Sequence, residues 1–313
     1  MKAFKVFSPG VLTTYQDLGR RGYRQFGIPI SGAMDTFALR AANLMVGNRE
    51  SETGLEVTLM GLKMVSLRPA LIAVTGADLN FTINSEYHPP WKRFSLKAGD
   101  VIHFQNRRSG LRAYLAVHGG FLTQSFMGSG SVFQRGLMGT PLKKDELLEV
   151  DRSEEENYPG SPEFQHEPFA YVAGQSQIRV ILGPQAERFT EEGLAAFLSS
   201  PYKIKSQSDR MAYRLEGTRI THRGKADIIS EPLLPGAIQV PNDGNPIILM
   251  ADGQTTGGYA KIANVISADL PVLAQRIPGE ALRFGPVDLD AAYNAMEERN
   301  RLLLHLKEDL PSP

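Results

Sequence analysis

Three polar stretches, each flanked by glycines, hold most of the residue types that could do chemistry in this sequence. The first is QDLGRRGYRQFGIPISGAMD at 16–35, the second is SQSDRM at 206–211, and the third runs from 238 to 259 and contains ADGQTTGGY. Arginines in such loops are suited to planar, bidentate capture of a carboxylate or a phosphate. The first stretch neither alternates like a strand nor carries the apolar stripe of a helix, so we expect a loop that holds polar groups in place.

The third stretch predicts a site at the end of a buried strand. Its apolar run at 247–250 is followed directly by Asp252, Gln254, Thr255 and Thr256. A buried strand that releases carboxylate, amide and hydroxyl groups at its tip is a common way to present a binding site. The structural alternative is that Asp and Arg side chains of these loops pair with each other and fix the ends of the strands. For any single residue both interpretations stay open, whereas three such loops together favour a site.

Composition and missing motifs exclude several classes of function. The 34 Lys and Arg balance the 34 Asp and Glu, so no basic excess indicates a nucleic-acid partner. The absence of cysteine excludes disulfides, thiolate metal sites and a cysteine nucleophile. There is no GxxxxGK[ST] phosphate loop and no GxSxG elbow, and the six histidines lack metal-ligand spacing, so we predict no metal site. No apolar run is long enough for a signal peptide or a membrane span, which favours a cytoplasmic protein without a membrane partner.

Strands must position these loops. Short segments rich in β-branched and aromatic residues, separated by Gly, Pro, Asn or Asp, predict a mainly β fold with a few short helices. Their spacing suits a barrel or sandwich better than βαβ units. The acidic, proline-containing segment 151–168 is the best linker candidate. We therefore predict two β-rich lobes, residues 1–160 and 161–313.

Three helices and one glycine-rich run complete the expectation. Asp35 is placed to cap a helix that ends near Gly47, a short helix is expected at 190–198, and a terminal helix at 288–306. The run GSGS at 128–131 could form a backbone nest for an anion, although a plain loop is the simpler interpretation.

Eight stretches of the sequence resemble one family. In the family's order they are TTYQDLGRRGYRQFGIPISGAMD, NLMVGN, LEVTLMG, GLRAYLAVHGG, IRVILGPQ, SDRMAYRLEG, PGAIQVPNDGNPIILMADGQTTGGYAKIA and DLPVLAQ…PGE…RF. They extend over nearly the whole chain, and the first stretch and DGQTTGGY are highly specific. The family is the KipA-like family, also called the biotin-dependent carboxyltransferase or allophanate hydrolase subunit 2 (AHS2) family. The departures are small, since Ala212 stands where the family often has Gly and Tyr15 where it often has Val.

The resemblance implies a fold, partners and a reaction. The fold is two β-barrel-like lobes related to cyclophilin. The partners are a KipI-like protein, which is the B component of the complex, and a LamB/YcsF-like protein, which is its A component. Members of the family include the C component of an ATP-dependent 5-oxoprolinase, in which 5-oxo-L-proline, ATP and water give L-glutamate, ADP and phosphate, with ATP and Mg²⁺ bound in the complex.

The implied chemistry gives the polar residues roles by type. A lactam is a poor electrophile, so the protein must position groups and stabilise charge while the carbonyl oxygen is phosphorylated and water attacks. The catalytic candidates are carboxylates that could orient water or hold Mg²⁺, namely Asp17, Asp35 and Asp252. The substrate-binding candidates are the other polar residues of the three stretches: Gln16, Arg20, Ser31, Ser208, Asp209, Arg210, Gln239, Gln254, Thr255, Thr256 and Tyr259. The substrate carboxylate suits the arginines and its amide edge suits the glutamines, and we expect these groups to converge in a cleft that a companion chain completes.

Two alternatives remain open at this point. One is a carboxyltransferase component that moves CO₂ from carboxybiotin to a urea-like substrate, which would need biotin on another carrier because this chain has no biotin attachment site. The other is a non-catalytic regulatory protein that acts by binding its KipI-like partner, in which case the polar loops are contact surface or strand-end structure.

Overall fold

The computed structural model describes residues 1–151 and 177–308. From residue 152 onward the predicted linker, like the predicted lobe boundary at 160/161, lies outside the described residues. The chain forms two compact units. The first unit consists of Met1–Arg20, Asp35–Ala170 and Asn300–Pro313, and the second of Arg21–Met34 and Tyr171–Arg299. The chain thus enters each unit more than once, and the first polar stretch is divided between them.

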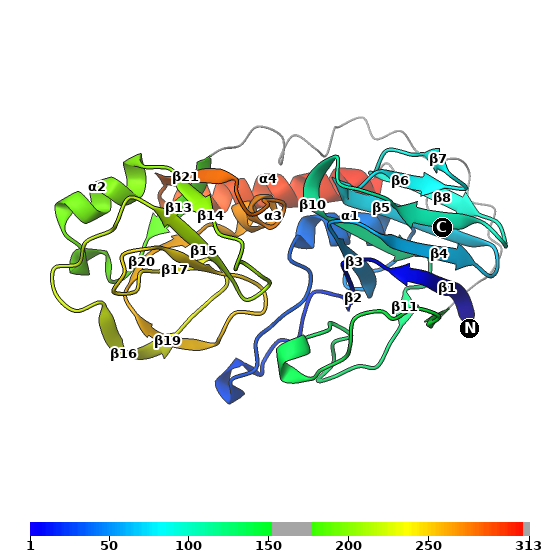
Figure 1. Ribbon diagram of the computed structural model, residues 1–313, viewed down its shortest axis with the longest axis horizontal. Helices are drawn as coiled ribbons and strands as arrows, with labels where there is room; N and C mark the ends of the chain where they lie inside the picture. The colour runs from blue at the N-terminus through cyan, green and yellow to red at the C-terminus, as the bar shows by residue number, and fades with distance from the viewer. Residues whose placement is uncertain (152–176, 309–313) are drawn as a thin grey trace. The chain divides into compact units, whose positions relative to one another are not determined.

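The first unit is built on two antiparallel sheets (Figure 1). In spatial order the larger sheet contains β11 (Phe121–Leu122), β12 (Leu147–Val150), β1 (Lys2–Pro9), β4 (Leu62–Ser66), β9 (Val101–Phe104), β6 (Phe81–Ile83) and β7 (Glu86–Tyr87). The smaller sheet contains β2 (Leu12–Gln16), β3 (Gly54–Thr58), β10 (Ser109–Val117), β5 (Ala70–Asp78) and β8 (Lys92–Leu96). A short 3-10 turn, η2 (Gln134–Gly136), lies in the long connection from β11 to β12.

The core of the first unit lies between its two sheets. Alternate residues of the strands point inward, such as Leu62 and Met64 of β4 and Leu55 and Val57 of β3, and all four are fully buried. Full burial of one such side chain is worth about 1.5–3 kcal/mol. The short strands predicted from the sequence therefore enclose a core between two sheets.

Helix α1 (Thr36–Met45) packs on β5 and β10 of the smaller sheet. Its start is fixed because the Asp35 carboxylate accepts a hydrogen bond from the Ala38 N–H at 2.9 Å. The Thr75 hydroxyl of β5 donates to the Ala38 carbonyl at 2.7 Å. The predicted helix and its Asp35 cap are confirmed, and Gly47 follows the helix with φ +75°, where glycine is favoured.

The second unit contains a closed barrel. In spatial order its strands are β13 (Gln177–Leu182), β20 (Lys261–Val265), β17 (Ala237–Gln239), β18 (Ile247–Leu249), β15 (Ala212–Gly217), β14 (Tyr202–Ile204) and β21 (Ala281–Pro286). The parallel pair β13–β21 closes it, and the other neighbours are antiparallel. A separate ribbon joins β16 (Asp227–Pro232) to β19 (Thr256–Tyr259), as Figure 1 shows. The mainly β prediction is confirmed.

Helices of the second unit are α2 (Glu191–Ser199) and α3 (Leu270–Ala274), with 3-10 turns η1 (Arg24–Phe26), η4 (Ala186–Arg188) and η5 (Ser267–Asp269). The last helix, α4 (Leu289–Glu308), begins in the second unit. There Ala295 packs with Ile266 and Ala268, whereas Tyr293 is 56% exposed. Among the described residues no helix is both long and apolar enough to cross a membrane.

Candidate functional site

Asp252 is the acceptor in a nearly buried ion pair of the second unit. It accepts hydrogen bonds from Arg210 Nε at 2.9 Å and Arg210 Nη2 at 3.1 Å, and from the Ser31 hydroxyl. The side chains of Arg210 and Asp252 are 9% and 8% exposed. Arg210 Nη2 also donates to the Gly32 carbonyl at 2.5 Å. A bidentate guanidinium–carboxylate pair fixes orientation as well as charge, so this pair fastens the loop 21–34 to the barrel.

The backbone around this pair explains why the sequence places it there. β18 ends at Leu249, and beyond it the Asp252 N–H donates to the Arg210 carbonyl at 2.9 Å. Ser31 has φ +59°, in the left-handed region, and its N–H donates to the Ala251 carbonyl at 3.1 Å. The strained serine is therefore held on both its backbone and its side chain by the segment that follows β18.

Ser208 and Asp209 serve the backbone of their own loop. The Arg214 N–H donates to the Ser208 hydroxyl at 3.0 Å. The Asp209 carboxylate accepts from the N–H groups of Met211 and Ala212 at 2.8 and 3.2 Å. These bonds shape the turn that delivers Arg210 to Asp252, which is a positioning role.

Gln239 and Gln254 meet at Gly257. A Cβ added to Gly257 would lie 2.9 Å from each of the two side-chain amide nitrogens and 2.6 Å from Leu233 Cδ1. The Gln239 amide donates to the Tyr259 carbonyl at 3.1 Å. Only glycine permits this close approach, so the glycines of the third stretch bring two predicted amides together.

Thr255, Thr256 and Tyr259 lie on or just before β19. Thr255 is buried and its carbonyl accepts from the Leu233 N–H at 2.8 Å. Thr256 is exposed, and Tyr259 is 37% exposed. These three residues are therefore part of the β16–β19 ribbon of the second unit.

A buried lysine, which the sequence interpretation missed, lies beside the glutamines. Lys261 is the cross-strand partner of Gln239 and is only 8% exposed. Its ammonium group contacts the Glu231 carboxylate at 2.5 Å, and Gln185 Nε2 donates to the same carboxylate at 3.0 Å. The hydrogen bond from Lys261 lowers the pKa of Glu231 below its ordinary value. The available signal was a lysine at the start of the mostly apolar strand KIANV, since lysine is almost never buried without a partner.

Asp17 belongs to a different cluster, in the first unit. Its carboxylate accepts from the Ser129 hydroxyl and the Gly130 N–H, both at 2.7 Å, and from the Ser131 hydroxyl. The N–H of Gly19 donates to it at 2.7 Å. The GSGS run at 128–131 thus holds the protein's own carboxylate, through two serine hydroxyls and one backbone N–H and not through a nest of successive backbone N–H groups.

Gln16 and Arg20 flank Asp17 and are also buried. Gln16 Nε2 donates to the Thr14 hydroxyl at 3.0 Å and to the Val132 carbonyl at 3.2 Å. Arg20 is 1% exposed and donates to the Ser131 carbonyl. The two side chains therefore hold the same connection, residues 129–132, against the end of β2.

Asp35 joins a buried network beneath α1. The Asp35 N–H donates to the Tyr114 hydroxyl at 2.7 Å, and that hydroxyl donates to Glu56 at 2.7 Å. Burial, together with the nearby Glu56 and Asp35 carboxylates, raises the pKa of Tyr114 well above its ordinary value. Arg112 Nε lies 3.7 Å from the Glu56 carboxylate. Asp35 thus caps a helix and sits in the first unit, as Asp17 does, while Asp252 sits in the second.

A family match decides the relationship of the chain to known proteins. The family model described as "Carboxyltransferase domain, subdomain A and B" matches residues 26–286. The chain belongs to this carboxyltransferase domain family. The resemblance found in the sequence is thereby confirmed.

Relatives of this carboxyltransferase domain fall into two groups. The C subunit of the Escherichia coli 5-oxoprolinase is 36% identical over 301 residues, covering 95% of each chain. The urea amidolyase of Lachancea kluyveri is 30% identical over 335 residues, covering 98% of this chain but 18% of that protein.

Solved structures share the fold of the chain. The Kluyveromyces lactis urea amidolyase matches with a TM-score of 0.89 and 29% identity, over 100% of this chain and 20% of that one. A crystal structure of TTHA0988 matches with a TM-score of 0.82 and 32% identity, over 91% of this chain. The match spans about half of the TTHA0988 chain, 56% of its length.

Hydrogen-bond donors of the second unit are the groups with a possible chemical role. Among residues 1–151 and 177–308, no group of three or more His, Asp or Glu side chains is arranged to hold a metal ion. In the second unit the amide nitrogens of Gln239 and Gln254 both lie near Gly257, and Lys261, whose ammonium group binds Glu231, is the cross-strand partner of Gln239. Such fixed donors can stabilise negative charge that develops on a carbonyl oxygen.

Proposed function

We propose that this chain is the C subunit of an ATP-dependent 5-oxoprolinase, which acts with a KipI-like partner chain and a LamB/YcsF-like partner chain. The observation that supports this most is the 36% identity to the Escherichia coli C subunit, because it covers 95% of both chains. A second protein of the same name, from Haemophilus influenzae, is 34% identical over 93% of each chain. In the Lachancea kluyveri urea amidolyase, by contrast, the matching region is only 18% of the protein.

The proposed reaction needs charge stabilisation at a lactam carbonyl. The γ-phosphoryl group of ATP passes to the carbonyl oxygen, water adds to the activated carbon, and the ring C–N bond and the bond to the phosphate both break, which gives L-glutamate and phosphate. Lys261 and the amides of Gln239 and Gln254 are the donors we assign to the carbonyl side of this reaction. In this proposal ATP and Mg²⁺ are bound by the assembled complex.

Asp252 has a positioning role in the proposed function. Its two oxygens already accept from Arg210 and Ser31. A carboxylate engaged in this way holds its partners in place, and the loop 21–34 and the Gln254 segment both depend on it.

The deciding experiment is a turnover assay with the three purified chains. We expect ATP hydrolysis that depends on 5-oxoproline and on the presence of all three chains, with L-glutamate formed in equal amount. ATP hydrolysis at the same rate with and without 5-oxoproline, or glutamate formation without this chain, would contradict the proposal.

Carboxyl transfer from carboxybiotin is the second candidate function. The description of the family and the similarity to urea amidolyases favour it. The same assay separates the two functions, because loss of activity on adding avidin, with a requirement for bicarbonate, is expected only for carboxyl transfer.

A further inference from the structure

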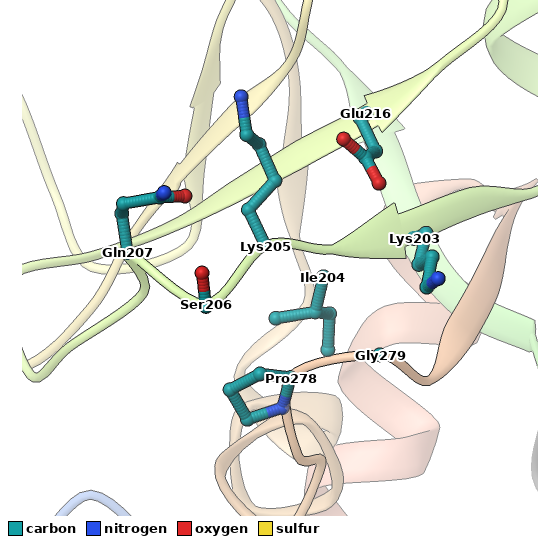
Figure 2. A pocket seen from close by; sticks show the side chains of 8 residues that line it. All are labelled: Lys203, Ile204, Lys205, Ser206, Gln207, Glu216, Pro278 and Gly279. Carbon is teal, nitrogen blue, oxygen red and sulfur yellow. The ribbon is translucent and has the colours of Figure 1, made fainter.

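A pocket of about 420 Å³ opens on the second unit, beside strands β14 and β15. Figure 2 shows the side chains that line it, with Lys203 and Glu216 on neighbouring strands and Lys205, Ser206 and Gln207 following β14. The remaining lining residues are Ile204, Pro278 and Gly279. None of these residues belongs to the Asp252 pair or the Lys261 cluster.

The lining is held by regular backbone bonds. Lys203 and Glu216 are direct cross-strand partners. Gly279 N–H donates to the Ile204 carbonyl at 2.8 Å, and Ile204 N–H donates to the Glu280 carbonyl at 2.9 Å. The pocket floor is therefore a strand pairing and not a loose loop.

The polar rim of the pocket is formed by one turn. The Ser208 N–H donates to the Lys205 carbonyl at 3.1 Å. Ser206 and Gln207 are the two central residues of this turn, and both are exposed. The rim therefore offers a hydroxyl and an amide side chain.

Three charged side chains, those of Lys203, Lys205 and Glu216, line the pocket. In the described part of the chain, no ion pair within 4 Å is formed by Lys203, Lys205 or Glu216. Asp243 is another acidic group near Lys205, and its carboxylate already accepts from Asn245 at 3.0 and 3.1 Å. Two lysines and one glutamate thus line the pocket without an ion pair to a described residue.

We propose that this pocket binds a small dicarboxylic amino acid. Its two carboxylates would pair with Lys203 and Lys205, and its ammonium group with Glu216, so that the ligand presents the opposite charge at each point. The two lysines are separated by one residue along the strand, a Cα spacing of about 7 Å, which their flexible side chains can match to a five-carbon diacid. The choice of L-glutamate as the ligand rests on the proposed function, because L-glutamate is the product of that reaction.

The turn that lines the pocket is continuous in sequence with the segment that carries Arg210, the partner of Asp252. The turn at Lys205–Ser208 leads directly into Asp209 and Arg210. A ligand held by this turn would restrict the segment that delivers Arg210 to Asp252. The pocket is thus placed to let the product bias the geometry of the second unit.

Binding of L-glutamate to the full chain, followed by calorimetry and by NMR titration, tests the proposal. Glutarate, which lacks the ammonium group, and 5-oxoproline and inorganic phosphate are the comparison ligands. We expect saturable binding of L-glutamate that weakens about tenfold or more in Lys203→Gln/Lys205→Gln, since two charged contacts are lost. Glu216→Gln is expected to weaken L-glutamate binding but not glutarate binding.

A matched control has the same charge change elsewhere. Lys92→Gln/Lys144→Gln alters two exposed lysines of the first unit and should bind L-glutamate as the unaltered chain does. Absence of saturable binding by the folded chain, or equal affinity in the Lys203/Lys205 variant, would overturn the proposal. Phosphate binding that equals L-glutamate binding and ignores Glu216 would overturn the amino-acid assignment. Because no partner chain is needed, these results are independent of the turnover assay on which the proposed function depends.

Discussion

At the scale of single residues, the predicted carboxylates differ in what holds them. Asp252 is paired with a guanidinium, Asp17 is surrounded by hydroxyl and N–H donors, and Asp35 caps a helix. A sequence indicates which acids stand in unusual loops, but it does not give the partner of each. Ser129 lies more than 100 residues from its partner Asp17, and Ser31 lies more than 100 residues from its partner Asp252. The pairing that the sequence left open as the structural alternative is present for Arg210 and Asp252.

Asp252→Asn should destabilise the protein by about 3 kcal/mol, because it leaves the buried Arg210 without its counter-charge. Urea unfolding followed by circular dichroism measures the change. The control is Glu191→Gln, which removes an exposed ion pair to Arg223 at 3.8 Å and should cost less than about 0.5 kcal/mol. A loss at Asp252 no larger than at Glu191 would show that the pair does not hold the loop 21–34.

Asp17→Asn should cost about 2 kcal/mol, since an amide nitrogen would face donors that now bind a carboxylate oxygen. Urea unfolding again measures the loss. The control is Asp145→Asn, which removes only an exposed contact to Lys5 at 3.1 Å. Equal unfolding midpoints for Asp17→Asn and Asp145→Asn would show that the hydrogen bonds from residues 129–131 to Asp17 do not stabilise the first unit.

At the scale of elements, the strands and α1 were predictable and the assignment of loops was not. Periodicity and caps are local, so the sequence indicated short strands and an Asp35-capped helix correctly. The membership of residues 21–34 in the second unit depends on contacts to residues 210 and 251–252. Lys261 was overlooked because a charged residue at the start of a mostly apolar strand is a weak signal until Glu231 is seen beside it.

Gly257→Ala tests the close packing of β19 against two amides. A methyl group there would lie within 3 Å of Leu233 Cδ1 and of the amides of Gln239 and Gln254. We expect a loss of about 1–3 kcal/mol in stability and a lower turnover number when all three chains are assayed together. Gly224→Ala is the control, because a Cβ at Gly224 meets no atom within 4 Å. Unchanged stability and turnover in Gly257→Ala would contradict the role assigned to Gln239 and Gln254 in the proposed site.

The ion pair between Glu231 of β16 and Lys261 of β20 should weaken at low pH. The hydrogen bond from Lys261 lowers the pKa of Glu231 in the folded chain below its ordinary value of 4.5. A depressed folded-state pKa means that the stabilisation is complete above the unfolded value and is lost as pH falls through the folded value. Carbon-13 NMR of the Glu231 carboxyl should give a midpoint below 4.5, and Lys261→Met should return it toward 4.5. A midpoint that Lys261→Met leaves unchanged would refute the link.

At the scale of the whole molecule, the polar stretches support two separate units. The hydrogen bonds described for the Asp17 carboxylate stay within the first unit, and those of the Asp252 carboxylate stay within the second. The expectation of one cleft shared by all three stretches remains a prediction. Such a cleft would involve both units, whereas the hydrogen bonds of each cluster lie within one unit. What the sequence does establish for the whole chain is the family, since its eight stretches extend over nearly all of it.

Separate clusters predict additive energies. Groups without shared partners usually add within about 0.5 kcal/mol, whereas groups in one network couple by about 0.5–3 kcal/mol. The unfolding free energies of Asp17→Asn and Asp252→Asn, summed over the transitions of the two units, should therefore add in the double variant. Ser31→Ala and Asp252→Asn should not add, because the Ser31 hydroxyl donates to Asp252 itself. A double-mutant cycle measured by urea unfolding decides the matter. Strong coupling between Asp17 and Asp252 would show that the two clusters act as one, which is what convergence in a single cleft requires.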